Sequence, residues 1–375
     1  MDNIVLFLTV VYKCADKIKF IFRKEILVLA AFLQKFGNPP NMGVCVACFE
    51  RDIAGALGLH RASVVQYIRP EIIGFVLGSL VAAFIFKEFK ARTGSAPLVR
   101  FILGMFAMIG ALAFLGCPWR AFLRLAGGDL NAIIGIAGLA SGIAVGDQFL
   151  KYGYNLGRSR NSYYSSGLIM PAIMAGLLLL LVFAPKFGAN GAIFLSEKGS
   201  GSMHAPLIIS LSAGLIIGFI AQRVRFCTMG SIRDVMLVRD FHLMRGVIAL
   251  FLSAFLINLM LGQVNFGIAA QPIAHSDYLW NFLGMVLAGL AFVLAGGCPG
   301  RQLILSGEGD TDAAIFVLGM ITGAAFAHNF GLAAKPDAVI DGVLKVGGVS
   351  SYGMTAVIIG ILACLIIGFT MREKI

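Results

Sequence analysis

Long hydrophobic runs alternate with short polar segments along the chain, and this pattern predicts membrane-spanning helices. A bilayer core about 30 Å thick needs about 20 apolar residues in a helix. Two runs, Ile72–Phe86 and Leu130–Gly146, are short but uncharged. Seven clearer candidates are Phe101–Leu115, Ser165–Pro185, Ala205–Gln222, Gly246–Val264, Leu279–Gly296, Ala313–Ala333 and Gly353–Met371.

The first hydrophobic run, Ile26–Gln34, is the weakest of the set. Glu25 and Lys35 leave only nine uncharged residues between them, which is about half of what a spanning helix needs. We therefore expect nine spans plus this doubtful first one.

The composition agrees with a membrane protein. Hydrophobic residues make up 59% of the chain and charged residues 13%, whereas a soluble domain has about 25% charged residues. The net charge of +11 comes from Lys and Arg scattered among apolar runs, unlike the basic stripe of a nucleic-acid-binding protein. We therefore expect basic loops that face anionic lipid and an anionic substrate, and no nucleic acid.

Positive charge is unevenly distributed between the loops on alternate sides of these spans. If the first run spans and the N-terminus is cytoplasmic, 20 of the 30 Lys and Arg residues lie on the cytoplasmic side, and the opposite loop 265–278 has none. Cytoplasmic loops of membrane proteins carry an excess of Lys and Arg. The pattern predicts a multi-pass protein of the inner (plasma) membrane that begins with a basic cytoplasmic segment, residues 1–24.

An unusual phrase occurs twice, about half the chain apart. Gly116–Ala132 (GCPWRAFLRLAGGDLNA) and Gly297–Ala313 (GCPGRQLILSGEGDTDA) are identical at seven of 17 positions. A second pair of phrases, CVACFERDI from Cys45 and CTMGSIRDV from Cys227, keeps Cys, Arg and Asp at the same spacing. The offsets of 182 and 181 residues indicate that the chain contains a duplication.

The duplication predicts two transmembrane repeats, 25–187 and 205–375, joined by a Gly- and Ser-rich linker at 188–204. Each repeat holds five spans if the first run is real, and an odd number of spans inserts the second repeat upside down. Inverted repeats of this kind are a transporter architecture. The predicted fold is an all-α integral membrane protein, with 9–10 transmembrane helices plus short re-entrant half-helices in two inverted repeats.

The Gly-Cys-Pro-x-Arg motif predicts a break followed by a new short helix. Gly116 allows a sharp turn, Pro118 suits the first helical turn, and Cys117 then lies near the N-cap, where the helix dipole favours thiolate and attracts anions. Arg120 adds positive charge about one turn away. The short helix cannot span the membrane, so it must lie inside the protein or line a cavity. The second half repeats the motif as Gly297, Cys298, Pro299 and Arg301.

The cysteines also have structural interpretations. A lone membrane cysteine usually packs as a small residue, and we keep that interpretation for Cys14 and Cys364. Cys45-x-x-Cys48 is similar to a redox or metal pair, but the second half has Gly230 at the Cys48 position, and no His stands at a zinc-like spacing. We therefore predict no metal site and expect Cys48 to be dispensable.

The phrases GCPWR, GCPGR and RFCTMG, together with the twofold repeat, resemble the YeeE/YedE family of membrane proteins, also described as the sulfur-transport family. The resemblance covers nearly the whole chain from about residue 25. CVACFERDIAGALGLHRASVVQYIRPEIIGFVLGS is most similar to the YedE-like branch associated with selenium metabolism. The resemblance implies thiosulfate uptake, an hourglass shape with short helices pointing at the centre, and cysteines along the path. By motif these are Cys117, Cys227 and Cys298.

The leading hypothesis is a transporter or permease for a small sulfur- or selenium-containing anion, without a cofactor. The alternative is a membrane redox or sulfur-transfer enzyme that uses the cysteines covalently. Expected partners are the anion, membrane lipid and, from the resemblance, a small cytoplasmic sulfur-carrier protein. The predicted substrate path consists of Cys45, Cys117, Cys227, Cys298, Arg120 and Arg301, with Gly116, Pro118, Gly230, Gly297 and Pro299 as supporting backbone positions. No catalytic residue is assigned.

Overall fold

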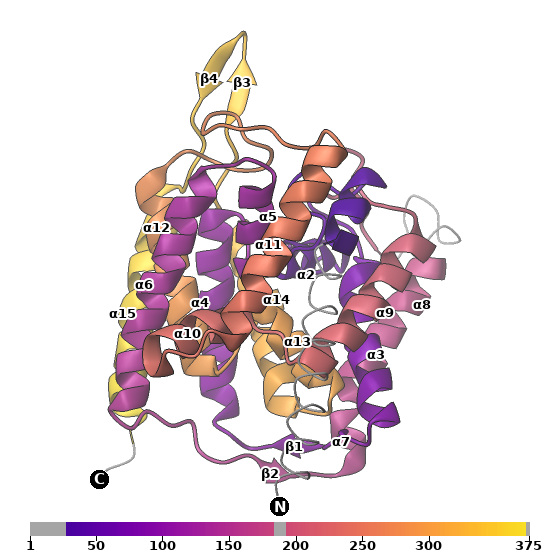
Figure 1. The fold of residues 1–375 in the computed structure, drawn as a ribbon, viewed down its shortest axis with the longest axis vertical. Helices are drawn as coiled ribbons and strands as arrows, with labels where there is room; N and C mark the ends of the chain where they lie inside the picture. Colours follow the sequence, from indigo (N-terminus) through magenta and orange to yellow (C-terminus); the bar gives the residue numbers. More distant parts are fainter. Residues whose placement is uncertain (1–27, 184–192, 373–375) are drawn as a thin grey trace, which may run out of the picture.

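The computed structural model describes residues 28–183 and 193–372, which are mostly helical (Figure 1). The predicted N-terminal segment 1–24 and the start of the predicted linker, 188–192, lie outside the described residues. Residues 28–35 are helical, and this helix covers most of the first run, Ile26–Gln34. The helices that follow are α2 (Val46–Ala56), α3 (Pro70–Ile85), α4 (Pro97–Phe114), α5 (Pro118–Ala126), α6 (Asn131–Lys151), α7 (Tyr164–Gly167), α8 (Ile169–Phe183), α9 (Leu207–Val224), α10 (Thr228–Val238), α11 (His242–Met260), α12 (Tyr278–Ala295), α13 (Pro299–Gly307), α14 (Thr311–Asn329) and α15 (Ser351–Thr370). Two antiparallel ladders pair β1 (Arg92–Thr93) with β2 (Arg160–Asn161) and β3 (Ala338–Ile340) with β4 (Val343–Lys345).

Three of the long apolar segments are broken in two by a turn at a cysteine. They are Pro97–Ala126, Leu207–Val238 and Tyr278–Gly307, which comprise α4 with α5, α9 with α10, and α12 with α13. Within the described residues, seven segments are long and apolar enough to cross a membrane, and α3 and α8 are shorter apolar helices. All nine predicted spans are therefore found as helices, which confirms the predicted all-α membrane fold.

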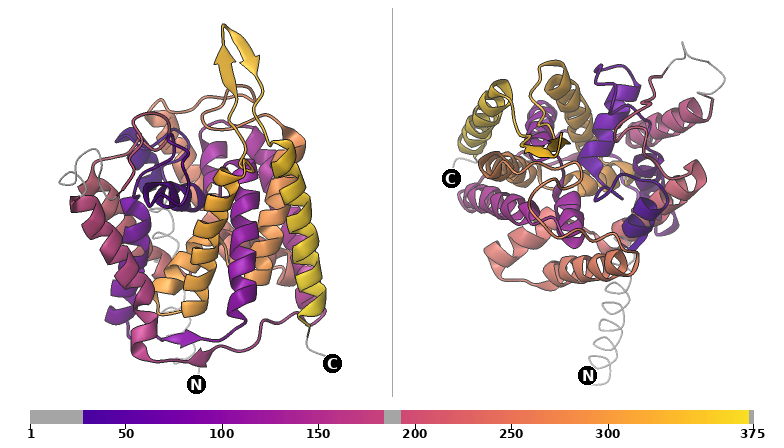
Figure 2. Two further views of the ribbon diagram at one scale, coloured as in Figure 1. Left: turned by 180° about the vertical axis from the view of Figure 1, so that it is seen from behind. Right: turned by 90° about the horizontal axis from the view of Figure 1, so that it is seen from above.

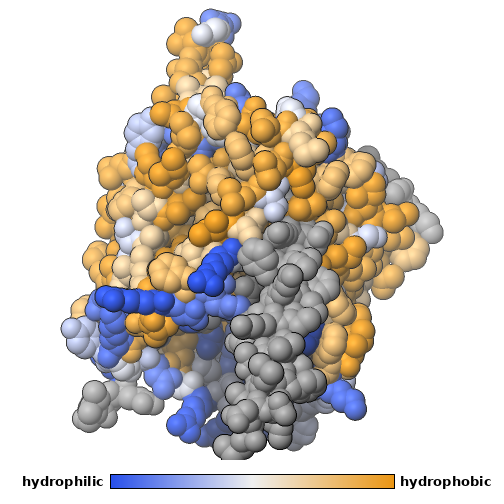
Figure 3. Space-filling view, viewed as in Figure 1, coloured by the Kyte–Doolittle hydropathy of each residue, from blue (hydrophilic) through white to orange (hydrophobic). Residues whose placement is uncertain are grey.

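The outer surface carries hydrophobic side chains along these helices. In Figure 3 hydrophobic residues cover most of the visible face, and hydrophilic residues gather toward its lower part. Leu179 of α8, Leu252 of α11 and Ile366 of α15 are 59%, 50% and 62% exposed. An apolar surface of this extent marks contact with a membrane rather than with water.

Corresponding helices of the two halves run in opposite directions along the long axis (Figures 1 and 2). Arg92, just before α4, pairs with Asp310, just before α14, so both helices start at the lower end in Figure 1. Tyr154, just after α6, pairs with Arg372, just after α15, so α6 and α15 both end there. The two similar phrases at 116–132 and 297–313 lead into α6 and α14, and these two helices run in opposite directions.

Glycines bring the central helices of the two halves into close contact in the same way on both sides. A Cβ at Gly138 of α6 would lie 2.3 Å from the carbonyl oxygen of Phe282 in α12. A Cβ at Gly319 of α14 would lie 2.2 Å from the carbonyl oxygen of Phe101 in α4. Each residue of the second contact is 181 positions from its counterpart in the first. Such small-residue contacts are how helices associate in lipid.

The last long helix of each half departs from this symmetry. α8 packs mainly on α3 and α13, whereas α15 packs on α12 and α4. The last long helices of the two halves therefore do not pack equivalently.

Candidate functional site

Four cysteines each cap the N-terminus of a short helix. Pro118 and Pro299 lie in the first turn of α5 and α13, so the predicted break and new helix are confirmed at both Gly-Cys-Pro motifs. The thiols before α2 and α10 also accept hydrogen bonds from backbone N–H groups three residues on, at 3.4 and 3.3 Å. The four capping residues are Cys45 before α2, Cys117 before α5, Cys227 before α10 and Cys298 before α13.

The sharp turn before each Cys-Pro is made one residue earlier than predicted. Leu115 and Gly296 have left-handed φ angles of 61° and 84°, whereas Gly116 and Gly297 do not have positive φ. Gly116 is needed for space instead, because a Cβ there would lie 3.0 Å from Cδ of Arg120. The motif glycine therefore leaves room for the motif arginine.

The half-helices α5 and α13 direct their N-terminal ends toward each other in the interior. The C-terminal end of α5 leads to Asp129, which bridges to Gly267 in the loop between α11 and α12. The C-terminal end of α13 leads to Asp310, at the opposite end of the molecule (Figure 1). Their first turns meet, since a Cβ on Gly300 of α13 would lie 2.5 Å from the Trp119 ring of α5.

The first thiol cluster consists of Cys45, Cys48 and Cys117, all buried. The sulfur atoms of Cys45 and Cys117 lie 3.8 Å apart. The Cys48 sulfur lies 3.8 Å from the carbonyl oxygen of Leu115 and 3.6 Å from the Arg120 guanidinium. Cys48 was not in the predicted path. Its position three residues after Cys45, hence on the same face of a helix, is the sequence signal that could have included it.

Arg120 brings a positive charge beside the first thiol cluster. Its fully buried guanidinium donates to the carbonyl oxygens of Leu115, Asn41 and Ile273, the last two at 3.2 and 3.0 Å. Among the ion pairs of residues 28–183 and 193–372, none involves Arg120. A buried charge without a counter-ion is costly, and an anion bound beside the thiols would compensate it.

The second thiol pair, Cys227 and Cys298, repeats this arrangement in the other half. The two buried thiols interact with each other, and Thr228, the first residue of α10, lies beside Cys298. Gly230 takes the position that Cys48 has in the first half, and its N–H donates to the Cys227 sulfur. The pair therefore keeps the capping geometry but has no third thiol.

Arg301 does not leave a free charge beside the second thiol pair. Its guanidinium forms an ion pair with Glu308 at 3.0 Å, and the two side chains are 13% and 14% exposed. The predicted symmetry of two motif arginines is therefore broken in charge, because Arg120 is bonded to carbonyl oxygens and Arg301 to a carboxylate.

A vestibule of about 1040 Å³ opens near the β3–β4 hairpin. It extends inward to Leu115, whose carbonyl oxygen is the one bonded to Arg120 and near Cys48. Its lining includes Arg51, Leu112, Ser200, Ile273, His328 and Lys335. Leu115 thus belongs to the wall of the vestibule and also contacts Cys48 of the first thiol cluster.

The wall of the vestibule carries positive charge. Asp52 pairs with both Arg51 and Arg69 at 2.7 Å, so the trio keeps one net positive charge. Burial lowers the pKa of the nearby His60 imidazole, which favours its neutral form. Arg51 and Asp52 thus form an ion pair between neighbouring residues, and Arg69 extends it.

The described residues contain no group of three or more His, Cys, Asp or Glu side chains that could hold a metal ion. The thiols are instead surrounded by backbone N–H groups and, in the first half, by a guanidinium. Such a set suits an anion better than a cation.

The comparison with known families concerns the second half of the chain. Residues 223–375 match the family described as sulphur transport. This stretch includes Cys227, Cys298 and Arg301, so the resemblance predicted from the motifs is confirmed where the second thiol pair lies.

Two curated proteins are also similar to this chain. The thiosulfate transporter TsuA of Spirochaeta thermophila is 31% identical over 103 residues, and that of Escherichia coli is 29% identical over 107 residues. Each match covers 28% of this chain, and 31% and 30% of the respective relative. The similarity therefore spans about a third of the length of these relatives.

Proposed function

We propose that the chain is a membrane transporter or permease for a small sulfur- or selenium-containing anion of the thiosulfate type. The observation that carries the proposal is the pair of thiol sites at facing half-helix ends, one of them beside a buried arginine that no described carboxylate neutralises. The sulphur transport family match and the two thiosulfate transporters support the same substrate class.

The arrangement suits passage of an anion through a low-dielectric interior. A dianion cannot enter a dry bilayer core without replacing its hydration. N–H groups at the half-helix ends replace part of it, and thiol groups offer weak hydrogen bonds to a terminal sulfur or selenium atom. Weak contacts at several successive sites let an ion enter and still leave. The proposed path runs from the vestibule to the first thiol cluster and then to the second thiol pair.

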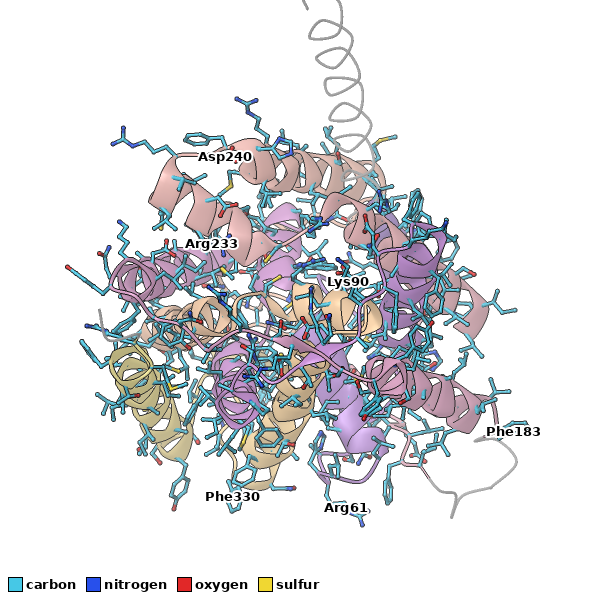
Figure 4. The ribbon with its side chains drawn as sticks, turned by 90° about the horizontal axis from the view of Figure 1, so that it is seen from below. Arg61, Lys90, Phe183, Arg233, Asp240 and Phe330 are labelled. Carbon is cyan, nitrogen blue, oxygen red and sulfur yellow. The ribbon has the colours of Figure 1, made fainter. Side chains whose placement is uncertain are left out.

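We further propose that the two halves are inverted repeats with the lower end of Figure 1 facing the cytoplasm. The opposite directions of α6 and α14 and the matched glycine contacts support the first part. Lys90, in the loop between α3 and β1, and Arg233, in the short helix α10, are labelled in the view from that end in Figure 4 and are among the basic residues that support the second. The vestibule would then open outward in the inner membrane, and a cytoplasmic sulfur-carrier protein would meet the lower end.

The alternative is a membrane sulfur-transfer or redox enzyme. The distance of 3.8 Å between the Cys45 and Cys117 sulfur atoms favours it more than the sequence did, because those residues are 72 positions apart. A covalent mechanism requires a cysteine that carries the substrate sulfur during turnover, whereas the transporter leaves every thiol free.

Uptake into cells that lack other import routes tests the proposal. Cells that express the chain should accumulate labelled thiosulfate, and unlabelled sulfite or selenite should reveal by competition how far the path accepts related anions. Equal uptake with and without the chain, at confirmed membrane expression, would reject a transporter. Persulfide formation on Cys117 or Cys298 at the rate of turnover would favour the enzyme.

A further inference from the structure

The two half-helices meet at one position of the repeated phrase, which holds different residues in the two halves. Trp119 follows Cys117-Pro118 in the first phrase, and Gly300 follows Cys298-Pro299 in the second, at the same offset of 181 residues. In the fold these two residues contact each other. Trp119 and Gly300 therefore mark the place where the first turns of α5 and α13 meet.

The Trp119 ring fills the space that the missing side chain of Gly300 leaves. A Cβ on Gly300 would lie 2.5 Å from Cζ2, 2.7 Å from Cε2 and 3.1 Å from Nε1 of the indole. The ring is 2% exposed, and its centroid lies 5.7 Å from that of Phe75 and 5.2 Å from that of Phe226. Because contacts below 3.0 Å require something to shift, one ring fits at this point and two do not.

The ring also adjoins residues next to both thiol sites. Trp119 stands two residues after Cys117, and its neighbour Phe226 immediately precedes Cys227. A small cavity of about 10 Å³ adjoins the ring and is lined in part by Thr228, the residue beside Cys298. A route through this part of the interior from one thiol site to the other would pass the indole.

The indole N–H has no hydrogen-bond partner within the described residues, although the side chain is buried. A buried Trp N–H usually finds a partner, and leaving one unpaired costs free energy. An anion that passes Trp119 would accept a hydrogen bond from this unpaired N–H group. Trp119 thus combines a steric barrier with a hydrogen-bond donor at the same place.

We propose that Trp119 is the specificity-determining barrier of the path, which separates the two thiol sites, donates its indole N–H to the passing anion, and depends on Gly300 for room. The inference rests on the proposed transport function. No bond to the substrate forms or breaks in it.

Variants of the full chain in proteoliposomes separate the two roles of the ring. Trp119→Phe keeps an aromatic barrier but removes the N–H, so thiosulfate uptake should fall about tenfold, as for one lost hydrogen bond to a charged group, while sulfate stays excluded. Trp119→Ala opens the barrier so that an anion passes with more of its hydration, and the thiosulfate-to-sulfate ratio of initial rates should therefore fall about tenfold. Trp280→Phe, which changes the other tryptophan in the first turn of α12, should leave both rates unchanged.

Reciprocal changes test the shared point directly. Gly300→Trp alone would force two rings into one place, so thiosulfate uptake should be lost. The double change Trp119→Gly with Gly300→Trp restores one ring, so uptake and exclusion of sulfate should recover above the level of either single variant. The shared contact point would be overturned if the double variant did not recover uptake although its expression and its melting in detergent matched the wild type.

A readout that does not depend on transport keeps the two proposals distinguishable. In the Trp280→Phe chain, Trp119 is the sole tryptophan, so its emission reports the site. Saturable change of this emission with thiosulfate, and not with sulfate, is expected. Normal uptake by Trp119→Phe together with unchanged selectivity of Trp119→Ala would overturn the inference and leave the transporter intact. Failure of the wild type to move thiosulfate would instead reject the proposed function.

Discussion

The first thiol cluster and the second thiol pair have the same backbone frame but different electrostatics. In both halves two cysteines cap two short helices and bring their thiols together. In the first half the motif arginine, Arg120, is fully buried and bonded to carbonyl oxygens. In the second half Arg301 is paired with Glu308. The capping cysteines hold corresponding positions in the two halves, whereas the charges beside them differ.

This difference gives the two sites different expected affinities for an anion. The uncompensated charge of Arg120 favours a bound anion, whereas Glu308 already neutralises Arg301. A path works when binding is strong enough for entry and weak enough for exit. We therefore interpret the first thiol cluster as the site of stronger binding and the second thiol pair as the site of weaker binding.

The largest expected effect follows from removing a thiol that both halves share. Cys117→Ser and Cys298→Ser should each lower thiosulfate uptake at least about tenfold, because the oxygen of serine replaces a soft contact to the terminal sulfur. Uptake is compared at matched membrane expression. Cys364→Ser, in the uninterrupted helix α15, is the matched control and should transport normally. Normal uptake by both thiol variants would remove the cysteines from the path.

The next effect distinguishes the two arginines. Arg120→Gln should reduce thiosulfate affinity about tenfold or more, since a buried charge-assisted contact is lost. The double variant Arg301→Gln with Glu308→Gln preserves the net charge and should change affinity less than about threefold. Affinity is measured from the concentration dependence of initial uptake rates. Equal losses in the two cases would contradict the assigned asymmetry.

The third prediction concerns fold stability, on which equivalent helix contacts in the two halves should have equal effects. Gly138→Ala and Gly319→Ala should each destabilise the fold by about 1–3 kcal/mol, the usual cost of overpacking, because the new Cβ would meet a carbonyl oxygen. Thermal unfolding in detergent measures the shift. Gly176→Ala in α8 meets nothing within 4 Å and should not lower stability. A clear loss in one half alone would show that the two interfaces are not equivalent.

The smallest effect concerns Cys48, the member of the first thiol cluster that has no counterpart in the second thiol pair. Cys48→Gly copies the second half, where Gly230 stands, and should lower thiosulfate affinity by less than about threefold because Cys48 makes long contacts of 3.6 and 3.8 Å. This keeps the sequence-based expectation that Cys48 is dispensable while allowing for its place beside Arg120. A loss as large as that of Cys117→Ser would make Cys48 a principal ligand.

Local signals in the sequence predicted the half-helices better than they predicted the contacts between them. Pro118 and Pro299 at the first turn are matters of local backbone chemistry, so the capping cysteines followed from the motif. The contact between Cys45 and Cys117 joins residues 72 positions apart and depends on how α2 packs near α4. No local pattern contains that information.

The sequence also did not predict the contact partners of the two motif arginines and of Trp119, because these contacts depend on tertiary packing. Arg120 and Arg301 occupy the same motif position, and the counter-ion Glu308 follows Arg301 by seven residues, where the first half has Gly127. The difference between Gly127 and Glu308 can be seen in the aligned phrases. The ion pair with Arg301 forms only because α13 brings the two side chains together. The contact between Trp119 and Gly300 requires both halves to be assembled.

The most direct test of the account is the initial rate of thiosulfate uptake relative to sulfate uptake in proteoliposomes that contain the purified full chain. Sulfate has a similar shape and the same charge but presents oxygens alone, so the comparison isolates recognition of the terminal sulfur. The account predicts a preference for thiosulfate of at least about tenfold, which Cys117→Ser lowers. Equal rates for the two anions, or a preference that this substitution leaves unchanged, would contradict it.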